Sequence, residues 1–108
     1  MRTLRELLDA LDTIEIPYTQ VDWLNGTEPE MPYIVLDPGD TRNWFADGKV
    51  SVMPVTYFIE LYTRQRDVLL EQRVQGMLND AGVGWQRTIL PLSDGRGILT
   101  RWYAQVFE

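Results

Sequence analysis

The stretch NWFADGKVSVMPVTYFIELYTR, residues 43–64, decides how this chain is expected to fold. At its centre stands Asp47-Gly48, a dipeptide that readily supplies the positive φ angles of a tight two-residue turn. A short extended segment precedes the turn over residues 42–45, and a long one follows it over Val50–Tyr62. Two extended segments joined by such a turn predict a β-hairpin.

The side chains of the long arm are expected to alternate between two faces of a sheet. Odd-numbered residues from Tyr57 to Leu61 share one face, and even-numbered residues from Phe58 to Tyr62 share the other. Pro54 has no amide hydrogen to donate, so we expect a bend or a sheet edge near it.

Two amphipathic helices are predicted, one before the hairpin and one after it. Thr3 and Glu6 have the spacing of a capping box, and leucines at helical spacing follow, which predicts a helix over Leu4–Asp12. Asp67 is a candidate N-cap for the second helix. That helix is expected to end just before Gly82, because glycine is favoured immediately past a helix end.

Further strands complete the predicted sheet. They fall within residues 18–24, over Tyr33–Asp37, and over Gly84–Leu92 and Ile98–Phe107 on either side of a turn at residues 93–97. The order of helix, strands, helix and two strands predicts an α+β fold, with a mixed or mainly antiparallel sheet and two helices packed on it. At 108 residues, the chain is expected to form a single domain, 1–108.

Composition narrows the chemistry that the chain can perform. It contains no His and no Cys, which removes imidazole bases, thiol nucleophiles and the usual zinc ligands. Asp37, Asp40 and Asp47 lack the spacing of a calcium-binding loop and suit turn positions instead. We therefore expect no enzyme, no catalytic residue, no cofactor and no metal, although an enzyme working with carboxylates alone stays open as a minor hypothesis.

Charge and hydropathy bear on the partners. The net charge is −6, and the segment up to Asp40 carries nine acidic residues against two arginines. An acidic region of this kind does not neutralise phosphates, so no sequence-specific nucleic-acid partner is expected. No apolar run approaches the roughly 20 residues that span a bilayer, and no membrane partner is expected.

The aromatic residues of the hairpin suggest a surface for association. Trp44 and Phe45 are adjacent, so in an extended chain they point to opposite faces and one core cannot bury both. One of them is expected to be an exposed anchor for a partner. The four tryptophans could alternatively form a ligand cage, but Trp102, in a nearly continuous apolar strand, is expected in the core.

Short blocks recur along most of the chain in a fixed order. They are Ile16-Pro17-Tyr18, Pro32-Tyr33-Ile34-Val35, Ala46-Asp47-Gly48-Lys49-Val50, Tyr57-Phe58-Ile59-Glu60-Leu61-Tyr62-Thr63 and Leu70-Glu71. This set, together with the closing hairpin, resembles the family of small tail-completion, or tail-terminator, proteins of long-tailed bacteriophages and prophages. Asp47-Gly48 stands where the family is expected to have Asp-Asn, and both dipeptides serve a turn.

The resemblance implies a virion structural protein without catalysis. Copies of the chain would form a ring, a hexamer, that caps the tail tube, joins it to the head, and contacts the tail-tube and head-completion proteins. The chain would then reside at the head-proximal end of the tail in the virion, and in the host cytoplasm during assembly. The hypothetical self-assembly interface is Trp44, Phe45, Asp47, Lys49 and Val50. A non-enzymatic module that binds a small molecule or peptide in an aromatic pocket is the alternative.

Overall fold

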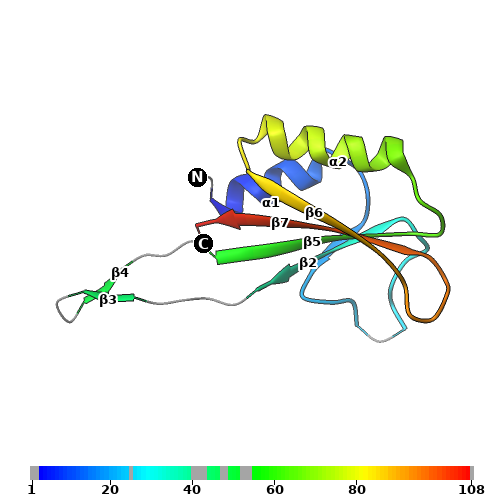
Figure 1. The fold of residues 1–108 in the computed structure, drawn as a ribbon, viewed down its shortest axis with the longest axis horizontal. Helices are drawn as coiled ribbons and strands as arrows, with labels where there is room; N and C mark the ends of the chain where they lie inside the picture. The colour runs from blue at the N-terminus through cyan, green and yellow to red at the C-terminus, as the bar shows by residue number, and fades with distance from the viewer. Residues whose placement is uncertain (1–2, 25, 40–43, 47–48, 52–54, 108) are drawn as a thin grey trace.

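The computed structural model describes residues 3–24, 26–39, 44–46, 49–51 and 55–107. The elements are α1 (Leu4–Asp12), β1 (Tyr18–Gln20), β2 (Tyr33–Pro38), β3 (Trp44–Ala46), β4 (Lys49–Ser51), β5 (Val55–Thr63), α2 (Val68–Asp80), β6 (Trp85–Pro91) and β7 (Ile98–Val106). A five-stranded sheet forms one layer, and both helices lie on the same side of it (Figure 1). The predicted α+β fold is therefore confirmed.

The five strands of the sheet follow the order β1-β2-β5-β7-β6. Strands β1 and β2 run parallel, and the other neighbours are antiparallel, so the sheet is mixed. The Tyr18 hydroxyl donates to the Asp12 carboxylate at 2.6 Å and thereby joins β1 to the end of α1. The indole of Trp102, in β7, donates to Gln75 of α2 at 3.4 Å. The two helices thus attach to different parts of the sheet.

Two strand pairs, β2–β5 and β3–β4, have the same pairing register. Tyr33 of β2 pairs with Tyr62 of β5, and Trp44 of β3 pairs with Ser51 of β4. The numbers 33 and 62, like 44 and 51, add to 95, so the two strand pairs share one register. However, β3 and β4 form a two-stranded sheet of their own, whereas β2 and β5 lie between β1 and β7.

The predicted hairpin arms are confirmed where the structure describes them. Ala46 pairs with Lys49, so two residues separate the paired strands, as expected for a tight turn. The predicted long arm consists of β4 and β5. The turn residues themselves, the first residues of the short arm and Pro54 lie outside the described residues.

Both helices begin at the predicted caps. The Thr3 hydroxyl accepts a hydrogen bond from the Glu6 amide at 3.2 Å, and the Asp67 carboxylate accepts one from the Leu70 amide at 3.0 Å. These bonds satisfy amides that have no partner inside the helix. Gly82, with a φ of 73°, follows the end of α2 and takes the left-handed conformation that glycine tolerates best.

The core lies between the helices and the sheet. Its largest side chain is Trp102, which is fully buried, as predicted. The odd-numbered residues of β5, among them Tyr57, Ile59 and Leu61, face the helices and are buried. Both predicted faces of β5 are therefore confirmed, and α1 and α2 supply the opposing apolar residues Leu7, Leu11, Val74 and Leu78.

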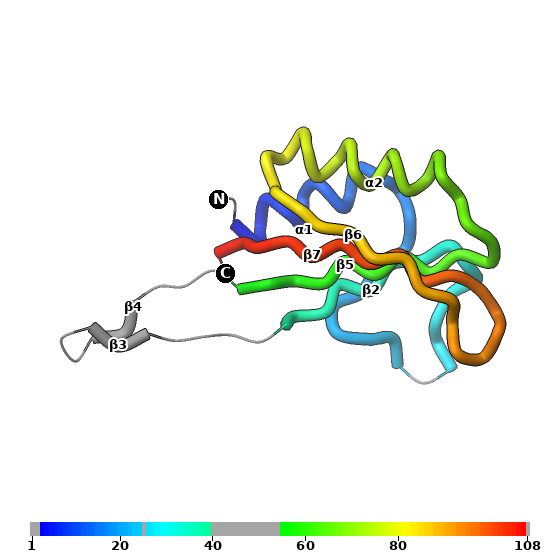
Figure 2. Tube along the Cα trace, in the orientation of Figure 1, coloured from blue at the N-terminus to red at the C-terminus, as the bar shows by residue number. Residues whose placement is uncertain are grey.

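The two ends of the described chain lie side by side (Figure 2). Thr3 forms a parallel bridge with Phe107, and the Leu4 amide donates to the Phe107 carbonyl at 2.6 Å. The β6–β7 connection is also close to β5, because a Cβ at Gly97 would collide with the Thr63 carbonyl. Neither helix, among the residues described, is both long and apolar enough to cross a bilayer.

Candidate functional site

The face of the five-stranded sheet opposite the helices carries a mixed aromatic and charged surface. Strand pairing places Phe58 opposite Tyr103 and Glu60 opposite Arg101, and Tyr33 lies opposite Tyr62. Neither helix covers this face (Figure 1). We call it the open face.

An ion pair lies at the centre of the open face. The Arg101 guanidinium donates from Nε and Nη2 to one carboxylate oxygen of Glu60, at 3.1 and 2.7 Å. These hydrogen bonds raise the pKa of Arg101 above its ordinary value. The guanidinium carbon also lies 5.4 Å from the centroid of the Phe58 ring, within cation–π range. Both charges are thus satisfied within the sheet itself.

Aromatic rings pack beside the ion pair. The rings of Tyr33 and Tyr62 stack with their centroids 5.0 Å apart, and Trp23 meets Tyr33 edge-on at 6.2 Å. Burial, and secondly the charge of Glu60, raise the pKa of Tyr62 to about 12. Phe58 and Tyr103 form a further edge-on pair at 5.3 Å. These contacts partly bury the Tyr62 hydroxyl among aromatic side chains.

A hollow of about 750 Å³ lies beside the open face at the β6 edge. Its lining includes Thr56, Trp85, Gln86, Tyr103 and Gln105, and none of these side chains is charged. Two aromatic rings and two amides suit a neutral polar ligand or an extended peptide, because rings supply contact area and amides supply hydrogen bonds.

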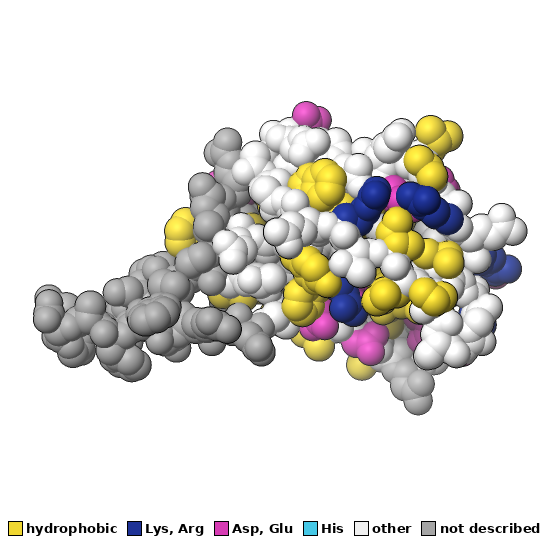
Figure 3. Space-filling view, viewed as in Figure 1, with side chains coloured by type: hydrophobic (Ala, Val, Ile, Leu, Met, Phe, Trp, Pro, Cys, Tyr) yellow, Lys and Arg dark blue, Asp and Glu magenta, His cyan; other side chains and the backbone are white. Residues whose placement is uncertain are grey.

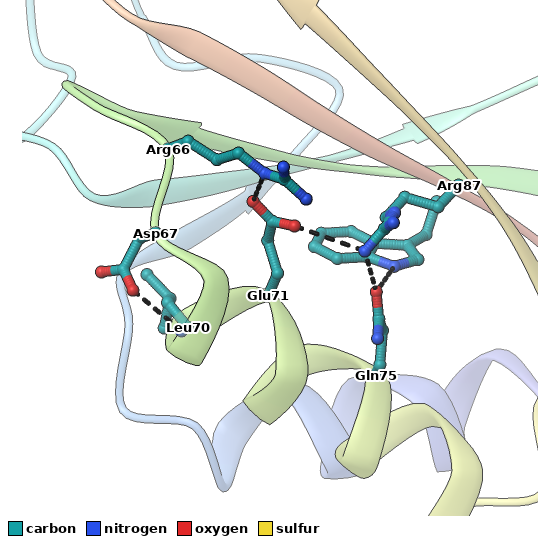
Figure 4. Close-up of polar contacts among 7 residues, drawn as sticks. Arg66, Asp67, Leu70, Glu71, Gln75 and Arg87 are labelled. Carbon is teal, nitrogen blue, oxygen red and sulfur yellow. Dashed lines mark hydrogen bonds and ion pairs between the residues drawn. The ribbon is translucent and has the colours of Figure 1, made fainter.

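A buried carboxylate organises the other side of the sheet, beneath α2. Figure 4 shows Glu71 pointing from α2 toward Arg66 and Arg87. Its two oxygens lie 3.4 Å from Arg66 Nε and 3.3 Å from Arg87 Nη1. The side chain of Glu71 is only 2% exposed. Because Arg87 also donates to Gln75 at 2.9 Å, this cluster fixes the β6 edge against α2.

The residues predicted as a self-assembly interface belong to the two-stranded sheet formed by β3 and β4, which we call the hairpin sheet. Trp44 and Phe45 lie in β3, and Lys49 and Val50 lie in β4, where Val50 pairs with Phe45. Asp47 lies outside the described residues. The strand pairing therefore brings four of the five residues into one two-stranded sheet, and their contacts with a second copy stay a prediction.

Two charged clusters were not predicted from the sequence. The pairing of Glu60 with Arg101 depends on the register between β5 and β7, which are separated by α2 and β6. The alternation of side chains along β5 did place Glu60 on the same face as Phe58 and Tyr62. This alternation was the one sequence signal that indicated a carboxylate among aromatic rings. Glu71 follows Leu70 in the apolar stretch of α2, and no sequence pattern distinguished it from a solvated glutamate.

The comparisons with known proteins name no relative. No protein-family model, curated protein or solved structure matches the chain. Within the described part of the chain, no three acidic residues gather in a group that could hold a metal ion. The surfaces of the fold and the sequence resemblance are therefore the two features of this chain that bear on its function.

Proposed function

We propose that the chain is a structural protein of a phage or prophage virion, which self-associates into a ring that caps the tail tube and joins it to the head. The observation that carries the proposal is the hairpin sheet formed by β3 and β4. It lies in the stretch with the strongest resemblance to tail-completion proteins and shares the register of the β2–β5 pair, and no third strand among the described residues pairs with it.

A strand pair with no third strand in the described part of the chain supports a role in association. An isolated two-stranded hairpin is marginally stable in water and gains stability when a further strand or a packed surface covers it. Trp44 and Phe45 add the ring area that dominates most association surfaces. A ring formed by head-to-tail contacts would cover this sheet on each copy.

The mass of the protein in solution tests the proposal. Sedimentation or light scattering across a concentration series should show oligomers of up to six copies, and a mixture with purified tail-tube protein should contain a complex of the two. A protein that stays monomeric at millimolar concentration and does not bind the tube would overturn the proposal.

Replacement of Trp44 tests the interface. Trp44→Ala should weaken association by about 2 kcal/mol, or roughly 30-fold in the dissociation constant, because aromatic anchors contribute on this scale. The melting temperature of the dilute protein should stay nearly unchanged. Leu24→Ala is the matched control, because Leu24 is a large hydrophobic residue that is 79% exposed on a different loop. Unfolding of Trp44→Ala would instead identify Trp44 as a core residue.

A second candidate function follows from the hollow lined by Trp85 and Tyr103. A non-enzymatic module that binds a small molecule or peptide would use this neutral, ring-lined space. Such a module should remain a monomer at every concentration, and Trp85→Ala should abolish ligand-induced stabilisation. Oligomers in the concentration series favour the first function over this one.

A further inference from the structure

Strand β6 is the long edge of the five-stranded sheet. It spans Trp85–Pro91 and pairs with β7 on one side only, with no other described strand beside it. The opposite edge, β1, is a strand of three residues. Directly after β1 comes Val21, whose φ of 73° is unusual for a β-branched residue and ends the extended conformation. The sheet therefore has one long edge and one short edge.

The direction of each backbone group in β6 follows from the β6–β7 turn. The Leu92 amide donates to the Gly97 carbonyl at 2.9 Å, so Leu92 faces β7. Backbone groups alternate in direction along an antiparallel strand. Trp85, Arg87 and Ile89 therefore present their N–H and C=O groups outward, away from β7. Pro91 follows at the end of the strand and has no N–H to offer.

Protection against strand pairing is confined to the end of β6. Natural edges carry lysines, prolines, bulges or inward-pointing charges that discourage pairing with another chain, and Pro91 blocks only the last position of the strand. The only charged residue in β6 is Arg87, and its guanidinium is bonded to Glu71 and Gln75 of α2. Leu90 is 40% exposed, and Leu69 at the start of α2 is 75% exposed.

The surface around this edge is apolar and basic. On the face shown in Figure 3, hydrophobic side chains form groups with Lys and Arg side chains between them, over the region where β6 runs in front in Figure 1. An edge with free backbone groups and apolar neighbours is suited to accepting another strand.

Among the residues that the structure describes, β3 and β4 form a strand pair with no third strand beside it. Each has three residues, so either strand can pair along part of the outward stretch of β6 from Trp85 to Ile89. We propose that the β3–β4 sheet of one copy adds to the β6 edge of the next copy, so that backbone hydrogen bonds continue the sheet from subunit to subunit. This rests on the proposed self-association and identifies the receiving surface. Because donor and acceptor differ, the contact is head-to-tail and can close into a ring.

A proline scan of the two edges tests the acceptor. Ile89→Pro removes one outward amide from β6 and should raise the concentration needed for association at least tenfold. Gln20→Pro is the matched control, because alternation from the bond between the Val21 amide and the Leu36 carbonyl directs the Gln20 amide outward at the β1 edge. Leu90→Lys is a second variant that adds an edge charge without removing a backbone bond, and it should weaken association in the same direction. Equal association of Ile89→Pro, Leu90→Lys and the unmodified protein would overturn the β6 assignment.

Engineered cysteines test the donor, because the natural chain has no Cys. Oxidation of the double variant Ser51→Cys, Leu90→Cys should link copies into a ladder that extends beyond dimers, and each single variant should remain unlinked. Dimers from Leu90→Cys alone would show that β6 pairs with itself, which overturns the proposal. If the unmodified protein forms oligomers and the β6 variants associate equally well, this inference fails and the proposed function survives. If it forms none at any concentration, with or without the tail-tube protein, both fail.

Discussion

The two sides of the five-stranded sheet each bury a glutamate, but they hold it differently. On the helix side, Glu71 lies under α2 between Arg66 and Arg87, and its side chain is 2% exposed. On the open face, Glu60 has a side chain that is 7% exposed and forms an ion pair with Arg101. A helix keeps water from the first carboxylate, whereas neighbouring side chains of the sheet shield the second.

The difference shows what a partner arginine contributes in each setting. The Arg101 side chain is 30% exposed, so it can regain water if Glu60 is removed. On the helix side, Arg87 is held by Gln75 as well as by Glu71, and the space left by Glu71 lies beneath a helix. Arg66 and Arg87 are 52% and 35% exposed and can also regain water, but the loss of Glu71 breaks two ion pairs and leaves a buried cavity under α2. The helix side should therefore be the more sensitive of the two.

The largest expected effect is that of Glu71→Ala. It should lower the free energy of unfolding by about 3 kcal/mol, because it removes a buried partner from two arginines and leaves a cavity. Urea denaturation of the dilute protein measures this loss. Glu71→Gln, which keeps the volume and an acceptor oxygen, should lose clearly less. Equal losses in the two variants would indicate that packing alone, and not the arginines, makes Glu71 important.

A smaller effect is expected for Glu60→Ala. Loss of hydrogen bonds to a charged group that can still reach water should cost about 1.5 kcal/mol. A double-mutant cycle with Arg101→Ala in urea denaturation isolates the pair, and the coupling should be favourable. If Glu60→Ala were more damaging than Glu71→Ala, the contrast between the two sides of the sheet would be wrong.

The smallest expected effect is a pH dependence in the alkaline range. Folding raises the pKa of Tyr62 from its ordinary value of 10.0 to about 12. Between these values the unfolded chain has lost the Tyr62 proton and the folded chain keeps it. The contribution of Tyr62 to the free energy of unfolding is therefore fully present below pH about 10 and is lost as the pH rises toward 12. Tyr62→Phe should reduce the fall in melting temperature between pH 9 and 11.5. An unchanged fall would show that the stacked tyrosines on the open face do not exclude water.

Local features of the fold were predictable, because their causes lie within a few residues. The caps at Thr3 and Asp67, the end of α2 at Gly82 and the two faces of β5 all follow from short-range geometry. The strand order was not predictable, since it depends on contacts between segments far apart in the chain. Prediction of the Glu60–Arg101 pair requires the pairing register of β5 and β7. Prediction of the β6 edge requires the order of the strands in the sheet.

The candidate interface was only partly predictable for the same reason. The hairpin residues around Trp44 could be selected because a tight turn and adjacent rings are local signals. The proposed acceptor strand, β6, could not be selected, because a sequence pattern does not distinguish an edge strand from a central one when its only charge, Arg87, is bonded within the fold. An unpaired strand edge can be recognised only from the strand order in the structure.

The single register shared by β2–β5 and β3–β4 restricts how this hairpin can change length during evolution. Side chains alternate between faces at every residue, so an insertion of one residue in one arm alone would turn over every side chain beyond it, and an insertion of two would shift its pairing partners. Insertions or deletions that keep the register must therefore occur as matched changes in both arms. Related chains should accordingly differ in hairpin length by even numbers of residues, divided equally between the arm before the turn and the arm after it.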